Sequence, residues 1–309
     1  MRTQPNIYRK VHCYFLAQRK LYRPDYCFFA STKSYSMRFF FILIATISLI
    51  AGCTPNNVTV DDTLGSFFTK HKVTGTFGIF DNGQGQFTIY NLTRFKDSAY
   101  TPASTFKIVN SLIAIKTGRV TDDKTVINWD GVIRTYPGGD TAHEWNRNLT
   151  MAEAFKYSAV PYYQQVARRI GKDTMQYWLD SLAYGNKKIS VIDSFWLDNS
   201  LKITSDEQLG LVKRLYFEQL PMDKRPQRIV KQMMLQEQNS NYELAYKTGW
   251  GTTPTGKEIG WVVGWIEENR HPYFFVLNLE GEKGMNMPEV RNQLLDELLR
   301  HLGFKEGKK

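Results

Sequence analysis

Segments with the pattern of β-strands lie near both ends of this 309-residue chain, and segments with helical periodicity fill the middle. Towards the N-terminus, Val73–Phe80 and Gln86–Tyr90 flank Asp81-Asn82-Gly83, a typical hairpin turn. Three further segments alternate or run apolar as strands do, namely Glu243–Thr248, Glu258–Glu267 and Tyr273–Leu279. This order predicts an α+β architecture: an antiparallel sheet from both chain ends, flanked by helices, with an inserted helical lobe.

Helices are expected where apolar residues recur with a period of about 3.6 residues. Gly118 and Gly171 follow two of these segments, where glycine commonly ends a helix. Neither an internal repeat nor a low-complexity linker interrupts residues 63–309, so we expect them to form one domain. The expected helices are Thr105–Thr117, Met151–Ile170, Lys172–Leu182, Ser205–Phe217, Gln227–Gln236 and Met287–Leu302.

Residues 1–52 have the pattern of a signal or targeting segment. The apolar run Phe39–Ala51 is shorter than the ~20 residues of a membrane span but suits a signal-peptide h-region. Ile50-Ala51-Gly52-Cys53 then resembles a bacterial lipoprotein box, in which cleavage precedes a cysteine that is lipidated. We expect an exported, periplasmic lipoprotein that Cys53 anchors to the membrane, with residues 53–62 as the tether. An uncleaved anchor and a plain secretory signal are the alternatives.

Residues 1–36 precede a complete signal sequence that begins at Met37. They are aromatic and basic without clear periodicity, and we interpret them as a misassigned start; a long n-region of the signal is the alternative. Cleavage before Cys53 would remove Cys13 and Cys27, leaving one cysteine. The exported domain is therefore expected to contain no disulfide and no cysteine-based metal site.

The net charge of +10 would by itself favour a nucleic-acid or membrane-surface partner. Eight of the 40 basic residues and one of the 30 acidic residues precede Cys53, which leaves 32 basic and 29 acidic residues. The exported domain is only mildly basic, so we exclude nucleic acid as a partner. The five histidines lack metal-ligand spacing, and no metal site is expected.

Ser104-Thr105-Phe106-Lys107 is the only S-x-x-K in the chain and follows Pro102, which suits the first turn of a helix. A spacing of three places the serine hydroxyl and the lysine ammonium on one helix face. A serine needs a base to become a nucleophile, and lysine qualifies if it loses its proton or its nitrogen is modified. Alone, this pattern is more often an ordinary helix start.

Other short motifs follow in order. Ser158-Ala159-Val160 lies inside the expected helix Met151–Ile170, and Tyr184-Gly185-Asn186 comes next. Lys247-Thr248-Gly249-Trp250 lies on an expected strand, whose edge could bind a substrate. A second K-T-G, Lys116-Thr117-Gly118, ends a helix, where glycine caps and lysine suits the dipole. We interpret that copy as structural.

The order of these motifs resembles the serine β-lactamase and penicillin-binding protein superfamily, and more narrowly the class D β-lactamases, or oxacillinases. The resemblance covers nearly the whole exported domain and implies an α/β/α β-lactamase/transpeptidase-like fold. It also implies β-lactam antibiotics as substrates, antibiotic resistance as the outcome, and a monomer or homodimer. Other matching segments are Pro102–Ile108, Asn110, Trp129-Asp130-Gly131, Pro161, Gln164-Gln165, Phe195-Trp196-Leu197 and Trp261–Gly264.

The resemblance implies that Ser104 forms an acyl-enzyme with the β-lactam and that Lys107 carries a carbamate (N6-carboxylysine) as general base. Carbon dioxide or bicarbonate supplies the carbamate, and no separate cofactor is expected. Only the neutral amine reacts with carbon dioxide, so burial that lowers the lysine pKa favours the modification. The indole N–H of Trp196 is expected to hold the carbamate.

The remaining implied roles concern proton transfer and substrate binding. Ser158 would pass a proton to the departing lactam nitrogen beside Lys247, and the backbone N–H groups of Ser104 and Trp250 would form the oxyanion hole. Thr248 and Arg291 would bind the substrate carboxylate. Val160 and Leu197 would cover the carbamate and govern water entry. The residues expected to bind substrate are Val160, Leu197, Thr248, Gly249, Trp250 and Arg291.

Three other functions compete with hydrolysis. A β-lactam sensor would acylate but deacylate slowly, a penicillin-binding peptidase would act on cell wall, and a binding lipoprotein would be catalytically inactive. The chain has no G-x-S-x-G elbow, and His143-Glu144 lacks the second histidine of a zincin. The range of β-lactams is expected to depend on two pocket loops, Thr135–Trp145 and Thr252–Lys257.

Overall fold

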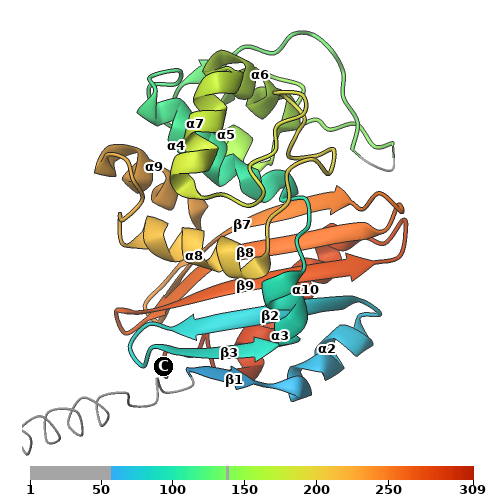
Figure 1. The fold of residues 1–309 in the computed structure, drawn as a ribbon, viewed down its shortest axis with the longest axis vertical. Coiled ribbons are helices and arrows are strands. Elements are labelled where there is room, and N and C mark those ends of the chain that lie inside the picture. Colours follow the sequence, from blue (N-terminus) through green and yellow to red (C-terminus); the bar gives the residue numbers. More distant parts are fainter. Residues whose placement is uncertain (1–56, 137–138) are drawn as a thin grey trace, which may run out of the picture. The chain divides into compact units, whose positions relative to one another are not determined.

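A seven-stranded sheet forms the centre of the computed structural model, which describes residues 57–136 and 139–309 (Figure 1). The predicted signal segment and Cys53 lie outside these residues. Strands of both chain ends meet where β2 pairs with β9, which confirms the expected α+β architecture. The strand order is β1-β3-β2-β9-β8-β7-β6. The strands are β1 Val58–Val60, β2 Thr74–Asp81, β3 Gln86–Tyr90, β6 Leu235–Gln238, β7 Tyr242–Thr252, β8 Glu258–Glu268 and β9 His271–Gly281.

The N-terminal edge of the sheet departs from expectation. Residues 53–62 were expected to be a tether, but Val58–Val60 form β1, which pairs in parallel with β3, whereas the other pairs in this sheet are antiparallel. A short Val-Thr-Val segment has high β-propensity and covers the open backbone groups of β3. The folded domain therefore begins before residue 63, and only the part of the tether that precedes Asn57 stays untested.

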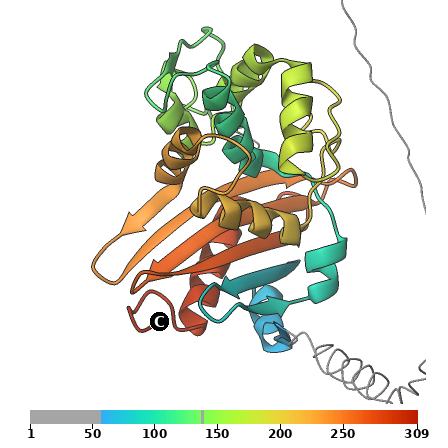
Figure 2. The same ribbon diagram turned by 60° about the vertical axis from the view of Figure 1, so that its left-hand side comes forward.

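Helices cover both faces of the sheet (Figures 1 and 2). Along β8, Val263 and Trp265 join the core that contains α8, whereas Val262 and Ile266 join the core that contains α10. This alternation is what a strand buried on both faces requires. The helices are α2 Gly65–Lys70, α3 Leu92–Asp97, α4 Lys107–Lys116, α5 Met151–Lys156, α6 Val160–Ile170, α7 Lys172–Leu182, α8 Ser205–Tyr216, α9 Lys224–Met234 and α10 Met287–His301.

Short elements complete the fold. Two 3₁₀ segments, η1 and η2, cover Asp62–Leu64 and Ala103–Phe106, and β4 (Val126–Ile127) pairs with β5 (Leu149–Thr150). Among the described residues, no helix has both the length and the apolar character needed to cross a membrane.

The segment expected as one helix over Met151–Ile170 is two helices, α5 and α6, separated at Tyr157–Ala159. Pro161 explains the break, because it lacks the N–H that would bond to the Tyr157 carbonyl in a continuous helix and its ring would clash with that carbonyl. Ser158 lies in the gap with a left-handed φ of 54°. The expectation that Ser158 lies inside a helix was therefore wrong. Because Ser158 lies outside both helices, the direction of its side chain is not set by helix geometry.

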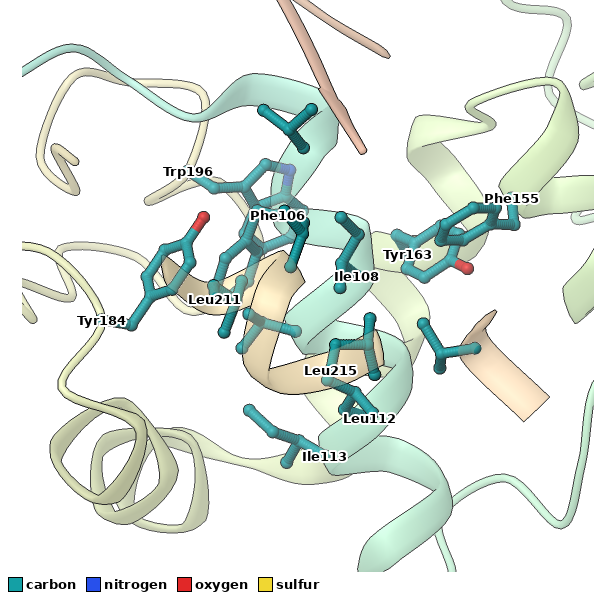
Figure 3. Close-up of a cluster of buried hydrophobic side chains, with 14 of the residues drawn as sticks. Phe106, Ile108, Leu112, Ile113, Phe155, Tyr163, Tyr184, Trp196, Leu211 and Leu215 are labelled. Atoms are coloured by element: carbon teal, nitrogen blue, oxygen red, sulfur yellow. The ribbon is translucent and has the colours of Figure 1, made fainter. Parts of the chain in front are cut away.

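The lobe made by α4–α7 and α9 packs around α4. From Lys107 to Ile115, every residue of α4 is buried, so this helix is a core element throughout. Phe106, directly before α4, stacks on Trp196 with ring centroids 5.4 Å apart. The ring of Tyr184 also packs against Phe106, at 5.7 Å between centroids (Figure 3). This packing fixes the segment that carries Ser104 and Lys107.

Candidate active site

Ser104 and Lys107 meet at the start of α4, as their spacing predicts. Lys107 Nζ lies 2.7 Å from Ser104 Oγ, within hydrogen-bond distance. The Lys107 side chain is buried, and among the described residues it forms no ion pair. Burial lowers the pKa of Lys107 to about 7. A substantial fraction of neutral amine at neutral pH is what a general base for Ser104 requires.

Close backbone approach positions the nucleophile segment against β7. A Cβ on Gly249 would lie 2.9 Å from Pro102 O, and one on Gly251 would lie 3.2 Å from the Ala103 Cβ. Ala103 itself has a left-handed φ of 48°. The glycines at these two strand positions therefore allow the turn before Ser104 to sit directly on the edge of the sheet.

Ser158 and Lys247 form the second polar pair of the site. Lys247 Nζ donates to Ser158 Oγ at 2.5 Å and to the Thr248 carbonyl at 3.0 Å. Burial lowers the pKa of Lys247 well below its usual value, and the nearby positive charges of Lys107 and Arg291 lower it further. The two ammonium groups repel each other, so protonation of one lysine favours the neutral form of the other.

Trp196 lies directly behind this nucleophile segment. Its backbone carbonyl accepts from Thr101 Oγ1 at 2.9 Å and from Ala103 N at 3.1 Å. Its indole Nε1 is buried and has no acceptor within the described part of the chain. Buried donors are normally paired, so an unpaired indole N–H indicates that an acceptor is missing. The contact between this N–H and a modified Lys107 stays a prediction.

A pocket of about 580 Å³ opens over the two serines. Seven of the predicted residues line it: Ser104, Ser158, Val160, Leu197, Thr248, Trp250 and Arg291. The other predicted residues, Lys107, Lys247, Gly249 and Trp196, do not line it. The remaining lining residues are Tyr136, Trp145, Tyr157, Gly251, Thr252, Glu258 and Pro288.

The sequence already pointed to several of these additional lining residues. Tyr136, Trp145 and Thr252 fall within the two loops expected to set the substrate range, and Tyr157 directly precedes Ser158. Glu258 was not singled out, because one glutamate at the start of a strand carries no local pattern.

Arg291, the least regular match in sequence, reaches the pocket from the first turns of α10. Its Nη1 donates to the Gly249 carbonyl at 2.7 Å, and its buried Nε has no partner among the described residues. No described carboxylate forms an ion pair with it. Burial lowers its pKa to about 10, so the guanidinium is cationic at neutral pH. A partly buried cation without a carboxylate partner among the described residues suits an anionic ligand.

Comparisons with known proteins match this fold. The model of the penicillin-binding protein transpeptidase domain matches residues 73–300. β-Lactamase OXA-48 of Klebsiella pneumoniae is 44% identical over 214 residues, which cover 69% of this chain and 78% of that protein. A class D β-lactamase from Sebaldella termitidis superposes with a TM-score of 0.74 at 33% identity, covering 80% of this chain and 97% of that one. The chain belongs to the class D β-lactamase family.

The class D family match does not by itself separate a hydrolase from a receptor. Regulatory protein BlaR1 of Bacillus licheniformis is 31% identical over 243 residues, covering 78% of this chain but 39% of that protein. The class D fold is therefore shared with part of a regulatory protein, and the reaction at Ser104 has to be argued from the site.

The second K-T-G of this class D chain plays the structural role expected of it. Helix α4 ends at Lys116, whose Nζ pairs with Asp223 at 2.5 Å, and Gly118 has a left-handed φ of 69°. Within the described ranges, no three histidine, cysteine or acidic side chains are grouped as a metal site would require.

Proposed function

We propose that this protein hydrolyses the amide bond of β-lactam antibiotics through an acyl-enzyme on Ser104 and thereby gives resistance. The observation that carries the proposal is the buried pair of Ser104 Oγ and Lys107 Nζ, 2.7 Å apart, with the lysine pKa lowered to about 7. A nucleophile next to a base of matched pKa is the arrangement that acyl transfer requires. The pocket over it has room for a bicyclic β-lactam.

Acylation begins when Ser104 Oγ attacks the lactam carbonyl carbon and its proton passes to the base at Lys107. The carbon–nitrogen bond of the ring then breaks, and the departing nitrogen takes a proton from Ser158 Oγ. Ser158 Oγ then regains a proton through Lys247, 2.5 Å from it, as the base at Lys107 gives up the proton that it took from Ser104. Water then attacks the carbonyl carbon of the ester while the base takes its proton. The bond from this carbon to Ser104 Oγ breaks, the base returns the proton to Ser104 Oγ, and the opened β-lactam leaves as the acid.

The residues around Lys107 fit a carbamate formed with carbon dioxide. Its buried amine titrates near neutrality, which supplies the neutral form that reacts, and the Trp196 indole offers a buried N–H without an acceptor. Lys107 would carry the carbamate and Trp196 would donate to it. When formed, it supplies the general base for both halves of the reaction. Val160 and Leu197 line the pocket and limit how water enters.

Trp196→Ala is expected to slow deacylation about tenfold or more, with partial recovery in excess bicarbonate, because the variant lacks the donor that would hold the carbamate. The measurement is turnover of a chromogenic β-lactam with and without bicarbonate, with the acyl adduct followed by intact mass. Trp129→Ala, at a partly exposed tryptophan outside the pocket, is the control. A bicarbonate response equal to that of the wild type would remove Trp196 from the mechanism.

Arg291→Ala is expected to raise KM for penicillins about ten- to a hundredfold, because binding of a carboxylate by a partly buried guanidinium is lost. Steady-state kinetics check this, with Arg300→Ala as control, since Arg300 lies on the same helix but is exposed and paired with Asp296. An unchanged KM in the Arg291 variant would exclude it as the carboxylate site.

The similarity to BlaR1 makes a β-lactam receptor the second candidate function. The same mass measurement separates the two. Continued turnover with a transient adduct supports hydrolysis, whereas one turnover followed by a stable adduct on Ser104 supports the receptor and overturns hydrolysis.

A further inference from the structure

Glu258, the first residue of β8, lines the pocket without a role in the chemistry above. The residue is only 7% exposed. The adjacent Lys257 is directed to Glu280 and Glu282 instead, and no ion pair of the described residues includes Glu258. A carboxylate buried without a cation is stable only if hydrogen-bond donors satisfy it.

Two donors from different elements satisfy Glu258. Trp250 Nε1, on β7, donates to Oε2 at 2.8 Å, and the backbone N–H of Gly284, in the loop between β9 and α10, donates to Oε1 at 3.1 Å. Each oxygen therefore serves one neighbour. Glutamine has the same length but would turn an NH₂ group towards one of the two N–H donors, so it cannot replace both bonds.

The two elements joined through Glu258 carry the substrate side of the pocket. Trp250 follows Gly249 on β7, and Gly284 leads into α10, which carries Arg291. Cross-strand pairing of Thr252 with Glu258 and of Trp250 with Gly260 places these residues on one face of the sheet. Arg291 Nη1 makes the only other polar tie described here between α10 and this end of β7, at the Gly249 carbonyl.

We propose that Glu258 is a positioning residue that locks the Trp250 indole to the segment before α10. The lock keeps Trp250 and Arg291 in one arrangement against the incoming β-lactam. This inference rests on the proposed function, since it assigns these two residues to substrate binding. Glu258 is expected to govern acylation, in which the substrate must first dock against this wall. Deacylation acts on a substrate already bonded to Ser104, beside Lys107, and should depend on Glu258 far less.

The test compares acylation and deacylation rate constants, measured separately by stopped-flow with a chromogenic β-lactam. Glu258→Gln is expected to lower the second-order acylation rate constant about tenfold and to change deacylation less than twofold. Glu282→Gln, at an exposed carboxylate on the same loop, is the control and should behave as the wild type. Trp250→Phe keeps the ring but removes the donor, so the double variant should be no slower than the slower single variant.

Additive losses in the double variant, or equal losses in acylation and deacylation, would overturn the proposal. A second measurement needs no catalysis: exchange of the Trp250 indole N–H with solvent, assigned by its absence in Trp250→Phe. Faster exchange in Glu258→Gln, with the other indole signals unchanged, supports the lock; unchanged exchange refutes it. If β-lactams never acylate the wild type, the proposed function is refuted. The exchange measurement would still test whether Glu258 holds the Trp250 indole.

Discussion

Ser104→Ala should lower the rate of β-lactam turnover by about four to six orders of magnitude. Removing the nucleophilic serine of a catalytic set costs about as much rate as removing all residues of that set. Ser158, the other serine that lines the pocket, should not take its place, since its Oγ is held by Lys247 at 2.5 Å and serves the leaving nitrogen. Turnover of a chromogenic β-lactam and intact mass after incubation measure the loss. The expected mass spectrum shows no adduct.

The fold should tolerate this substitution, since one oxygen is removed at a residue held by the packing of Phe106 and the backbone of Ala103. Ser181→Ala, at an exposed serine of α7, is the matched control. An acyl adduct that persists on the Ser104 variant would place the nucleophile elsewhere and refute the mechanism.

Lys107→Met should abolish turnover and at the same time stabilise the protein. Loss of a general base costs about 10²- to 10⁴-fold in rate, and acylation and deacylation both use this base. Methionine has nearly the same length and buries no charge. In wild-type protein, burial lowers the pKa of Lys107 from 10.5 to about 7, so folding disfavours the protonated lysine.

The pH dependence of this gain has a definite sign. Between about pH 7 and pH 10.5 the unfolded wild type binds one more proton at Lys107 than the folded protein does, so its stability rises with pH. The advantage of Lys107→Met should therefore be full below pH 7 and disappear towards pH 10.5. Thermal melting in buffer stripped of carbon dioxide measures it, because carbamate formation would stabilise only the wild type.

Lys116→Met, at the other end of α4, is the matched control. Lys116 is partly exposed and pairs with Asp223, so its loss should bring neither the gain in melting temperature nor the loss of turnover. A melting temperature that falls in Lys107→Met at neutral pH would show that the buried lysine is not destabilising.

Periodicity and spacing were sufficient where the chemistry is local. The pair Ser104 and Lys107 needs only a helix start and a spacing of three, and both lie as expected. Ser158 was placed in a continuous helix because its neighbours are helix formers. The effect of Pro161 on the residues before it decided otherwise, and the resulting break brings Ser158 to Lys247.

Long-range contacts set what the sequence pattern missed. Val58–Val60 resembled a tether because β3, the strand with which it pairs, lies about 30 residues away in the sequence. Glu258 acquires its partners from β7 and from the loop before α10, and neither contact leaves a mark in the adjacent sequence. Arg291 reaches the pocket through the packing of α10, which no spacing rule supplies.

The pairing of β2 with β9 has a consequence for how the chain is made. Strand β2 pairs with β3, which follows it closely in the chain, but its second neighbour is β9, where Thr74 pairs with Glu280 about 200 residues later. Such distant pairing slows folding, because the entropy of closing a large loop is lost before the contacts between the strands contribute favourable free energy. A nascent chain halted before residue 271 would contain Ser104 and Lys107 but lack β9, the strand that joins β2 to β8 in the sheet. Activity should therefore appear only after β9 has been synthesised and has paired, rather than growing with chain length.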